Sequence, residues 1–343
     1  MVEVIDSAVR PRFSRDVSLT TDGELVRIED GTYRAAFPSS AVTLADLERW
    51  AAGGSPAELL ADVRGWLDCP EPRAREVVER LFSTGLLVDP EAARLDSVPG
   101  AYVACRLVDA FRREFPRVLR DAPLLRALAA GPDHGLAAGL LLETYFVVRA
   151  ASWSAEPVFR HRMTAVQRAA LEEFRASESG HGNLLLGGFA ALGLDVDVLR
   201  TAEEAVETMA YSHAYGAFGW QGVAEFAAAL ILPEVRAAGA DSARPGTDVL
   251  DLLEREHGIP EALIRRFRAH DADDVEGDHG GLPSLLLSEE HELGQAKVTR
   301  LFTVLRQMMD LYRGHLDAVH RRYARWLPGE DPTRQLPDNA YRF

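Results

Sequence analysis

Apolar residues recur every three to four positions through most of the chain, a spacing typical of amphipathic α-helices. The pattern runs without a β-rich interruption from Tyr102 to Trp326. It predicts helices over residues 102–120, 123–130, 135–153, 163–192, 198–238, 249–257, 261–276 and 286–326. Successive amphipathic helices bury their apolar stripes against one another, so this part of the chain is predicted to be a helical bundle.

The first 90 residues have a different pattern. Val17–Pro38 contains β-rich segments around two Asp-Gly turns, at residues 22–23 and 30–31. Three short helices are predicted next, over residues 43–53, 55–67 and 71–85. The predicted fold is therefore mainly α, with a small winged-helix-like module (β-hairpin and three helices, residues 1–90) before a helical bundle (residues 101–328). Asp89–Gly100 is the predicted linker between them.

Composition narrows the classes of partner and compartment. The net charge of −15 argues against a nucleic-acid-binding or anionic-membrane-binding surface. No stretch of about 18 uninterrupted apolar residues predicts a membrane span, and the N-terminus lacks the apolar core of a signal peptide. The two cysteines, Cys69 and Cys105, form no metal or disulfide spacing, so a cytoplasmic location is expected.

Candidate chemistry begins in the stretch Leu171–Leu185. Glu178 and His181 continue the apolar stripe of Leu171, Phe174 and Leu185, so both side chains are predicted to point into the core. A buried carboxylate beside a buried imidazole needs a partner, and a metal ion is one such partner. The plainer interpretation is a core histidine with satisfied hydrogen bonds, next to a glutamate that reaches solvent.

Four more ionisable residues lie on predicted core stripes of three other helices. They are Glu143, Glu225, His270 and Asp274. Each has an ordinary explanation by itself, such as an ion pair between Glu143 and Arg149. Buried acids on several helices of one bundle are harder to explain separately, because each lone buried charge is costly. Carboxylates and histidines that converge inside a bundle suit two iron or manganese ions.

This ordered set resembles the haem-oxygenase-like diiron oxidases and oxygenases. Their pattern is a Glu, then Glu-x-x-His, sometimes a further Glu, and then His-x-x-x-Asp-x-x-His. The matching positions here are Glu143, Glu178, His181, Glu225, His270 and Asp274. The resemblance implies two Fe(II) ions, with O₂ as co-substrate and an amino acid, amine or related small molecule of specialised metabolism as substrate. It implies catalytic roles for Glu143, Glu178, His181 and His270.

The sequence departs from that family at the last histidine. The expected position is Gly277, with Asp278 and His279 beside it. On a continuous helix Asp278 is better placed to join the metal ligands, whereas His279 points away unless the helix breaks at Gly277, which glycine permits. A weak second metal site is expected. The extra Glu typical of the N-oxygenating members is replaced by Leu171, which argues against N-oxygenation.

The first 90 residues resemble the small leader-peptide-binding proteins of pyrroloquinoline-quinone biosynthesis. The segments that carry the resemblance are DGTYR, TLADLERW, GGSPAELLADV and VVERLFSTGLLVD, in that order. The resemblance implies that a leader peptide, a peptide-linked substrate or a partner enzyme binds this module. A fold-stabilising extension without a ligand is the alternative, and homodimerisation is left open.

Other functions fit the sequence less well. A haem oxygenase would need one proximal histidine and not a surplus of inward carboxylates. A thiaminase-like enzyme would need a nucleophilic cysteine. DDVEGD (residues 273–278) is similar to the Mg²⁺ motif of terpene cyclases but lacks its partner motif. The non-enzymatic alternative is a peptide- or carrier-binding scaffold with a degenerate bundle. The substrate and the bond attacked cannot be read from the sequence.

Overall fold

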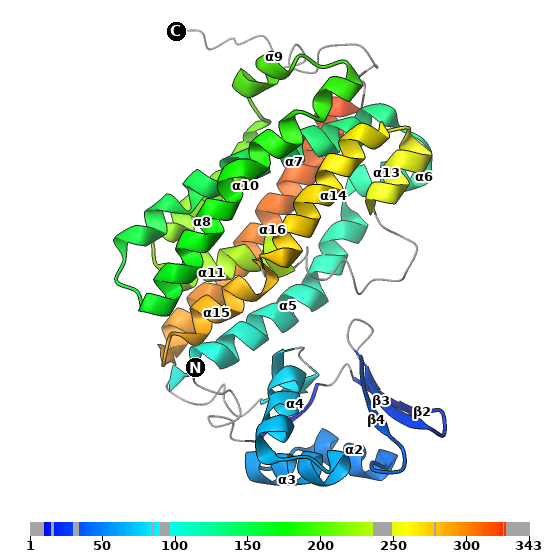
Figure 1. Ribbon diagram of the computed structural model, residues 1–343, viewed down its shortest axis with the longest axis vertical. Helices are drawn as coiled ribbons and strands as arrows, with labels where there is room; N and C mark the ends of the chain where they lie inside the picture. The colour runs from blue at the N-terminus through cyan, green and yellow to red at the C-terminus, as the bar shows by residue number, and fades with distance from the viewer. Residues whose placement is uncertain are drawn as a thin grey trace. The chain divides into compact units, whose positions relative to one another are not determined.

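The computed structural model describes residues 10–14, 17–29, 34–83, 86–89, 97–235, 249–277, 279–324 and 326. The chain divides into two compact units, each of which is described by itself. One unit combines residues 1–113 with 283–303, and the other combines 114–282 with 304–343. Figure 1 shows a mainly α protein with a small β-containing N-terminal part, which confirms the predicted fold class.

The N-terminal strands form two small antiparallel sheets. Their bounds are β1 Arg12–Phe13, β2 Ser18–Thr21, β3 Leu25–Glu29, β4 Arg34–Pro38 and β5 Leu87–Val88. The strand order is β2-β3-β4 in one sheet, and β1 pairs with β5 in the other. Gly23 sits in the left-handed region (φ +94°) and Asp22 accepts the backbone N–H groups of Glu24 and Leu25, so the first Asp-Gly turn was correctly predicted. The second turn lies outside the described residues.

Three helices lie between β4 and β5 in the chain: α2 Leu44–Ala52, α3 Pro56–Leu67 and α4 Glu71–Ser83. Thr43 and Asp46 form a capping box at the start of α2, as Ser55 and Glu58 do for α3. Each box satisfies backbone N–H groups that the first helical turn leaves without a partner. The local signals therefore set where these helices begin.

From Ser97 onward, the regular elements of the described residues are helices apart from one short strand pair. Its helices are α5 Gly100–Asp121, α6 Pro123–Ala130, α7 His134–Ser154, α8 Ala165–Leu186, α9 Val196–Thr201, α10 Val206–Gly219, α11 Val223–Leu230, α13 Val249–His257, α14 Glu261–Glu276, α15 Leu282–Ser288 and α16 Gln295–Tyr323. Short turns of helix are η2 Glu156–Arg160, η3 Phe189–Leu192, η4 Ile231–Val235 and η6 His279–Gly281. Strand β6 (Ser97–Val98) pairs with β7 (Leu293–Gly294).

Two long predicted helices are broken in the structure. The segment predicted over 198–238 divides into α9, α10, α11 and η4, and the last predicted segment divides into α15 and α16. Gly222, with extended backbone angles, separates α10 from α11. Apolar periodicity continues through such breaks because both pieces face the same core, so periodicity alone did not reveal them.

The helices that carry the chemistry pack directly on one another. Helix α8 lies against α7 and α14, and α7 also lies against α10 (Figure 1). At Gly182 of α8 an added Cβ would lie 3.2 Å from the Cα of Arg149 on α7, so glycine allows this close approach. Among the described residues, one stretch, His134–Arg160, is long and apolar enough to cross a membrane, but 61% of its most apolar 18-residue window is buried within the protein. A core helix passes the same test.

Candidate metal centre

Helix α8 presents one chemically active face. Thr164 and Gln167 form the capping box that starts the helix. Leu171, Phe174 and Leu185 are buried, and Glu178 and His181 are buried on the same stripe. The Nδ1 atom of His181 lies 3.3 Å from a carboxylate oxygen of Glu178 one turn earlier. The predicted inward direction of this pair is therefore correct.

Helix α14 brings the second pair to the same place. His270 and Asp274 are one turn apart, with Nδ1 of His270 3.3 Å from Oδ2 of Asp274. The other oxygen of Asp274 lies 3.6 Å from Nδ1 of His181. The ring centroids of His181 and His270 are 4.6 Å apart. The predicted convergence of the α8 and α14 pairs is therefore present in the structure.

Two further side chains complete the group. Nδ1 of His279, from η6, lies 3.4 Å from Oε1 of Glu178 and 3.3 Å from Oδ1 of Asp274. It also lies 3.8 Å from Oε2 of Glu234, from η4. We call the six side chains the α8/α14 cluster: Glu178, His181, Glu234, His270, Asp274 and His279. Among the described residues, three sets of potential ligand atoms lie within 4.8 Å of one another. They are Glu178, His181 and His270; Glu178, Asp274 and His279; and His270, Asp271 and Asp274, of which Asp271 is exposed.

The cluster fits a metal ion because four of its buried polar atoms make no hydrogen bond. The six side chains expose only 4–12% of their surface. No hydrogen bond is made by Nδ1 of His181, Nε2 of His270, Oδ1 of Asp274 or Nδ1 of His279. Buried polar atoms without partners are rare in proteins and costly. Three imidazoles and three carboxylates are a donor set that iron, manganese and zinc accept.

The carboxylates and imidazoles of the cluster shift one another's pKa values. The adjacent carboxylate of Glu178 raises the pKa of His181, although burial acts in the opposite direction. Burial by itself would raise the pKa of Asp274, but the nearby imidazoles of His279, His270 and His181 lower it overall. His181 and Asp274 are therefore each stabilised in the charged form by their neighbours in the cluster.

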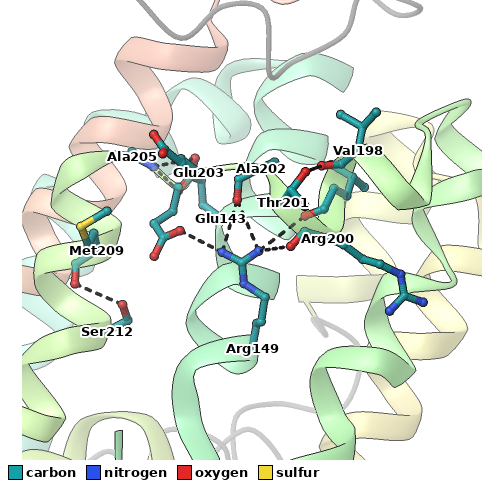
Figure 2. A network of polar contacts seen from close by, with 12 residues as sticks. Glu143, Arg149, Val198, Arg200, Thr201, Ala202, Glu203, Ala205, Met209 and Ser212 are labelled. Carbon is teal, nitrogen blue, oxygen red and sulfur yellow. Dashed lines mark hydrogen bonds and ion pairs between the residues drawn. The ribbon is translucent and has the colours of Figure 1, made fainter. Parts of the chain in front are cut away.

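Glu143 is not part of this cluster, contrary to the expected ligand pattern. Its carboxylate lies 2.9 Å from Nη1 of Arg322 and accepts the Tyr323 hydroxyl at 2.8 Å. It also accepts the backbone N–H of Ala205 at 3.0 Å, at the start of α10 (Figure 2). Glu143 is fully buried, and these three contacts account for its presence in the core. Glu143 points into the core as predicted, but its charged partner there is Arg322.

Arg149, on the same helix as Glu143, makes further contacts in this polar network. Its guanidinium donates to the carbonyl oxygens of Arg200 and Ala202 at the end of α9, and lies 3.0 Å from the carboxylate of Glu204 (Figure 2). A cation at a helix C-terminus satisfies carbonyl groups that the last turn leaves free. Helix α7 therefore holds the α9–α10 connection at both ends, with Glu143 at one and Arg149 at the other. The alternative explanation of Glu143, an ion pair with Arg149, is not found: Glu143 pairs with Arg322 and Arg149 with Glu204.

Glu225 is likewise outside the metal-capable groups found among the described residues. Glu234, nine positions later, reaches the cluster. Nine residues of α-helix span about 13 Å, so the two glutamates do not reach one site together. The change of register comes from η4, a π-helical segment at Ile231–Val235, which rotates the residues after Leu230 relative to an ideal α-helix. Short π-helical insertions are frequent at functional sites, and Pro233 was the one sequence signal of irregularity here.

His279 supplies the imidazole that the sequence lacks at Gly277. Helix α14 ends at Glu276, and Gly277 donates to the Asp273 carbonyl in the closing turn. A Cβ at Gly277 would lie 2.9 Å from Cδ2 of His279, so the ring folds back across the space that glycine leaves. The helix break that would be needed to direct His279 inward is present. Asp278, which was preferred from the sequence, lies outside the described residues.

The thiaminase-like alternative, which needs a nucleophilic cysteine, gains no support from Cys105. Burial raises the pKa of the Cys105 thiol to about 12. A thiol with so high a pKa is protonated at neutral pH and is a poor nucleophile.

Comparison with known proteins supports the fold. The chain is similar to the crystal structure of a domain of unknown function with a heme oxygenase-like fold, from Shewanella denitrificans. The match covers 64% of this chain and 92% of that one. The TM-score is 0.55 and the sequence identity 17%. No protein-family profile matches the chain, and no curated protein is similar to it. The chain thus has a haem-oxygenase-like fold, and its bundle carries a buried cluster suited to metal ions.

Proposed function

We propose that the bundle is a non-haem diiron oxidase or oxygenase. The observation that carries the proposal is the α8/α14 cluster, in which four ligand-type atoms converge without hydrogen-bond partners. A haem-oxygenase-like fold is compatible with this chemistry. Haem binding fits the cluster less well, because three buried carboxylates would have no cation to balance them.

The two oxygens of Glu178 point to different imidazoles, which suits a bridging carboxylate. Oε2 lies 3.3 Å from His181 and Oε1 lies 3.4 Å from His279. Asp274 similarly has one oxygen near His279 and the other near His270. Carboxylates shared in this way hold two metal ions about 3.5–4 Å apart. His181 and His270 would serve one ion, and His279 with Glu234 the other.

Iron in both positions would supply the electrons that reduce O₂. The protein would contribute a buried site, which limits access of water, and carboxylates that balance the charge of the ions. Neutral imidazoles are required, so a protonated histidine must lose one of its two ring protons before it binds a metal. The substrate class, an amino acid, amine or related small molecule, is supported by the sequence resemblance alone.

The role proposed for the N-terminal module also depends on resemblance. A leader peptide, a peptide-linked substrate or a partner enzyme would bind residues 1–90 and bring substrate to the bundle. Binding of a fluorescently labelled candidate leader peptide to the full chain, and its loss when residues 1–90 are removed from a folded remainder, would test this role.

The metal proposal is tested by anaerobic Fe(II) titration of the metal-free chain, followed by a pulse of O₂. We expect two Fe(II) per chain and an O₂-dependent change in absorbance. His181→Ala should abolish the absorbance change, and His270→Ala should lower the stoichiometry. His213→Ala, an exposed histidine of α10 that belongs to no metal-capable group, is the matched control.

A second candidate function is a binding scaffold without catalysis. The wild-type chain would then bind neither Fe(II) nor Mn(II) with micromolar affinity, and the three histidine variants would behave alike. That result would refute the diiron proposal.

A further inference from the structure

The hydroxyl of Ser177 connects the α8 backbone to the outer edge of the cluster. Its Oγ lies 2.8 Å from the carbonyl oxygen of Phe174, to which it donates. The same Oγ lies 2.9 Å from Nε2 of His279. A hydroxyl has one proton and two acceptor lone pairs. With its proton on the Phe174 carbonyl, Ser177 must accept at the second contact, so Nε2 of His279 carries the ring proton.

This assignment decides the state of the other ring nitrogen. A neutral imidazole with its proton on Nε2 has a bare lone pair on Nδ1. Nδ1 of His279 faces Oδ1 of Asp274 at 3.3 Å and Oε1 of Glu178 at 3.4 Å, and it makes no hydrogen bond. A cation placed between these three atoms would accept a lone pair from each of them. The tautomer set by Ser177 is therefore the one that a metal ion needs.

The other neutral tautomer of His279 would block metal binding. With the proton on Nδ1, His279 could donate to Asp274 or Glu178, and this hydrogen bond would occupy the atoms that a metal uses. Ser177 favours the open form because its accepting lone pair is matched only by Nε2–H. The ring is also fixed by the edge of Phe174, whose centroid lies 5.2 Å from that of His279.

We propose that Ser177 is a positioning residue that selects the metal-binding tautomer of His279. The proposal deepens the diiron proposal and rests on it for the identity of the ion. It is independent of that proposal in one respect, because the contact between Ser177 and His279 does not involve the metal. In many metal sites the second nitrogen of a ligating histidine is held by such a hydrogen bond, and its loss costs about 10–100-fold in metal affinity.

The test uses three variants of the full chain. Ser177→Ala removes the acceptor, and Ser177→Thr keeps it. Ser179→Ala is the matched control, because the Ser179 hydroxyl makes the same kind of backbone contact, to Ala176 at 2.7 Å, on an exposed part of the same helix. Alanine is a good helix former, so neither alanine variant should unfold.

The first measurement is ¹⁵N NMR of histidine-labelled, metal-free protein, recorded as a pH series, with the His279 signals assigned from a His279→Asn variant. The wild type, Ser177→Thr and Ser179→Ala should show a protonated Nε2. Ser177→Ala should move the proton to Nδ1. The second measurement is anaerobic Fe(II) titration, in which Ser177→Ala alone should bind one ion about 10–100-fold more weakly.

An unchanged tautomer in Ser177→Ala would overturn the proposal, whatever the metal affinity. Equal loss of affinity in Ser177→Ala and Ser179→Ala would also overturn it, because the loss would then reflect the helix and not His279. If the wild type bound no Fe(II), the diiron proposal would fail, and the NMR result would still decide the role of Ser177.

Discussion

Gly277→Ala should impair metal binding without destabilising the protein. The added Cβ would lie 2.9 Å from Cδ2 and 3.0 Å from Nε2 of His279, whereas ordinary contacts begin at 3.4 Å. The difference of 3.4 − 2.9 Å requires the ring to move by about 0.5 Å. Metal sites tolerate displacements of about that size or less. The shift also disturbs the 2.9 Å contact between Nε2 and Ser177.

The backbone gives no reason for a stability loss. Gly277 is exposed and is not among the described glycines with positive φ, so alanine can adopt its conformation. Replacing glycine by alanine at such a site changes the free energy of unfolding by about 0.5–1 kcal/mol, in the stabilising direction. One metal ion should bind at least about tenfold more weakly, which corresponds to about 1.4 kcal/mol.

The assay pairs two measurements on the same protein: urea unfolding of the chelator-treated chain, and anaerobic Fe(II) titration. Gly180→Ala is the control, because it lies on α8 between Glu178 and His181 and its added Cβ would meet nothing within 4 Å. We expect wild-type metal affinity in the control and reduced affinity in Gly277→Ala. Wild-type affinity in both variants would show that the position of the His279 ring does not depend on Gly277.

Three further predictions concern the same bundle. Metal loading should rise with pH through the raised pKa of His181. In the metal-free chain, the cluster should stabilise the fold most between about pH 4 and 6.5, and less below that range as Asp274, whose pKa is lowered, gains a proton and above it as His181 loses one. Unfolding measured across pH, with and without metal, tests both expectations. Glu234→Gln should weaken Fe(II) binding while Glu225→Gln leaves it unchanged, and the reverse order in titrations would contradict the assignment. Glu143→Ala should lower the free energy of unfolding by about 3–5 kcal/mol, because it leaves Arg322 unpaired, yet keep the metal stoichiometry of folded protein.

The bundle and four of the six side chains of its cluster could be predicted from the sequence, because they depend on local periodicity. Glu178 and His181 share a stripe with buried leucine and phenylalanine, as do His270 and Asp274 with theirs. A helix of 3.6 residues per turn places such residues on one side wherever the helix lies. The capping boxes at Thr43 and Ser55 are equally local, and they marked the helix starts correctly.

Only the tertiary structure decided what each buried acid faces. Glu143 and Glu178 look alike in the sequence, since each continues a core stripe, but Arg322 and Tyr323 from the far end of the chain meet the first. Glu234 and His279 reach the cluster through a π-helical segment and a helix end, where 3.6-residue periodicity no longer applies. Periodicity fixes the face of a regular helix, whereas the partner across that face depends on packing between residues distant in sequence.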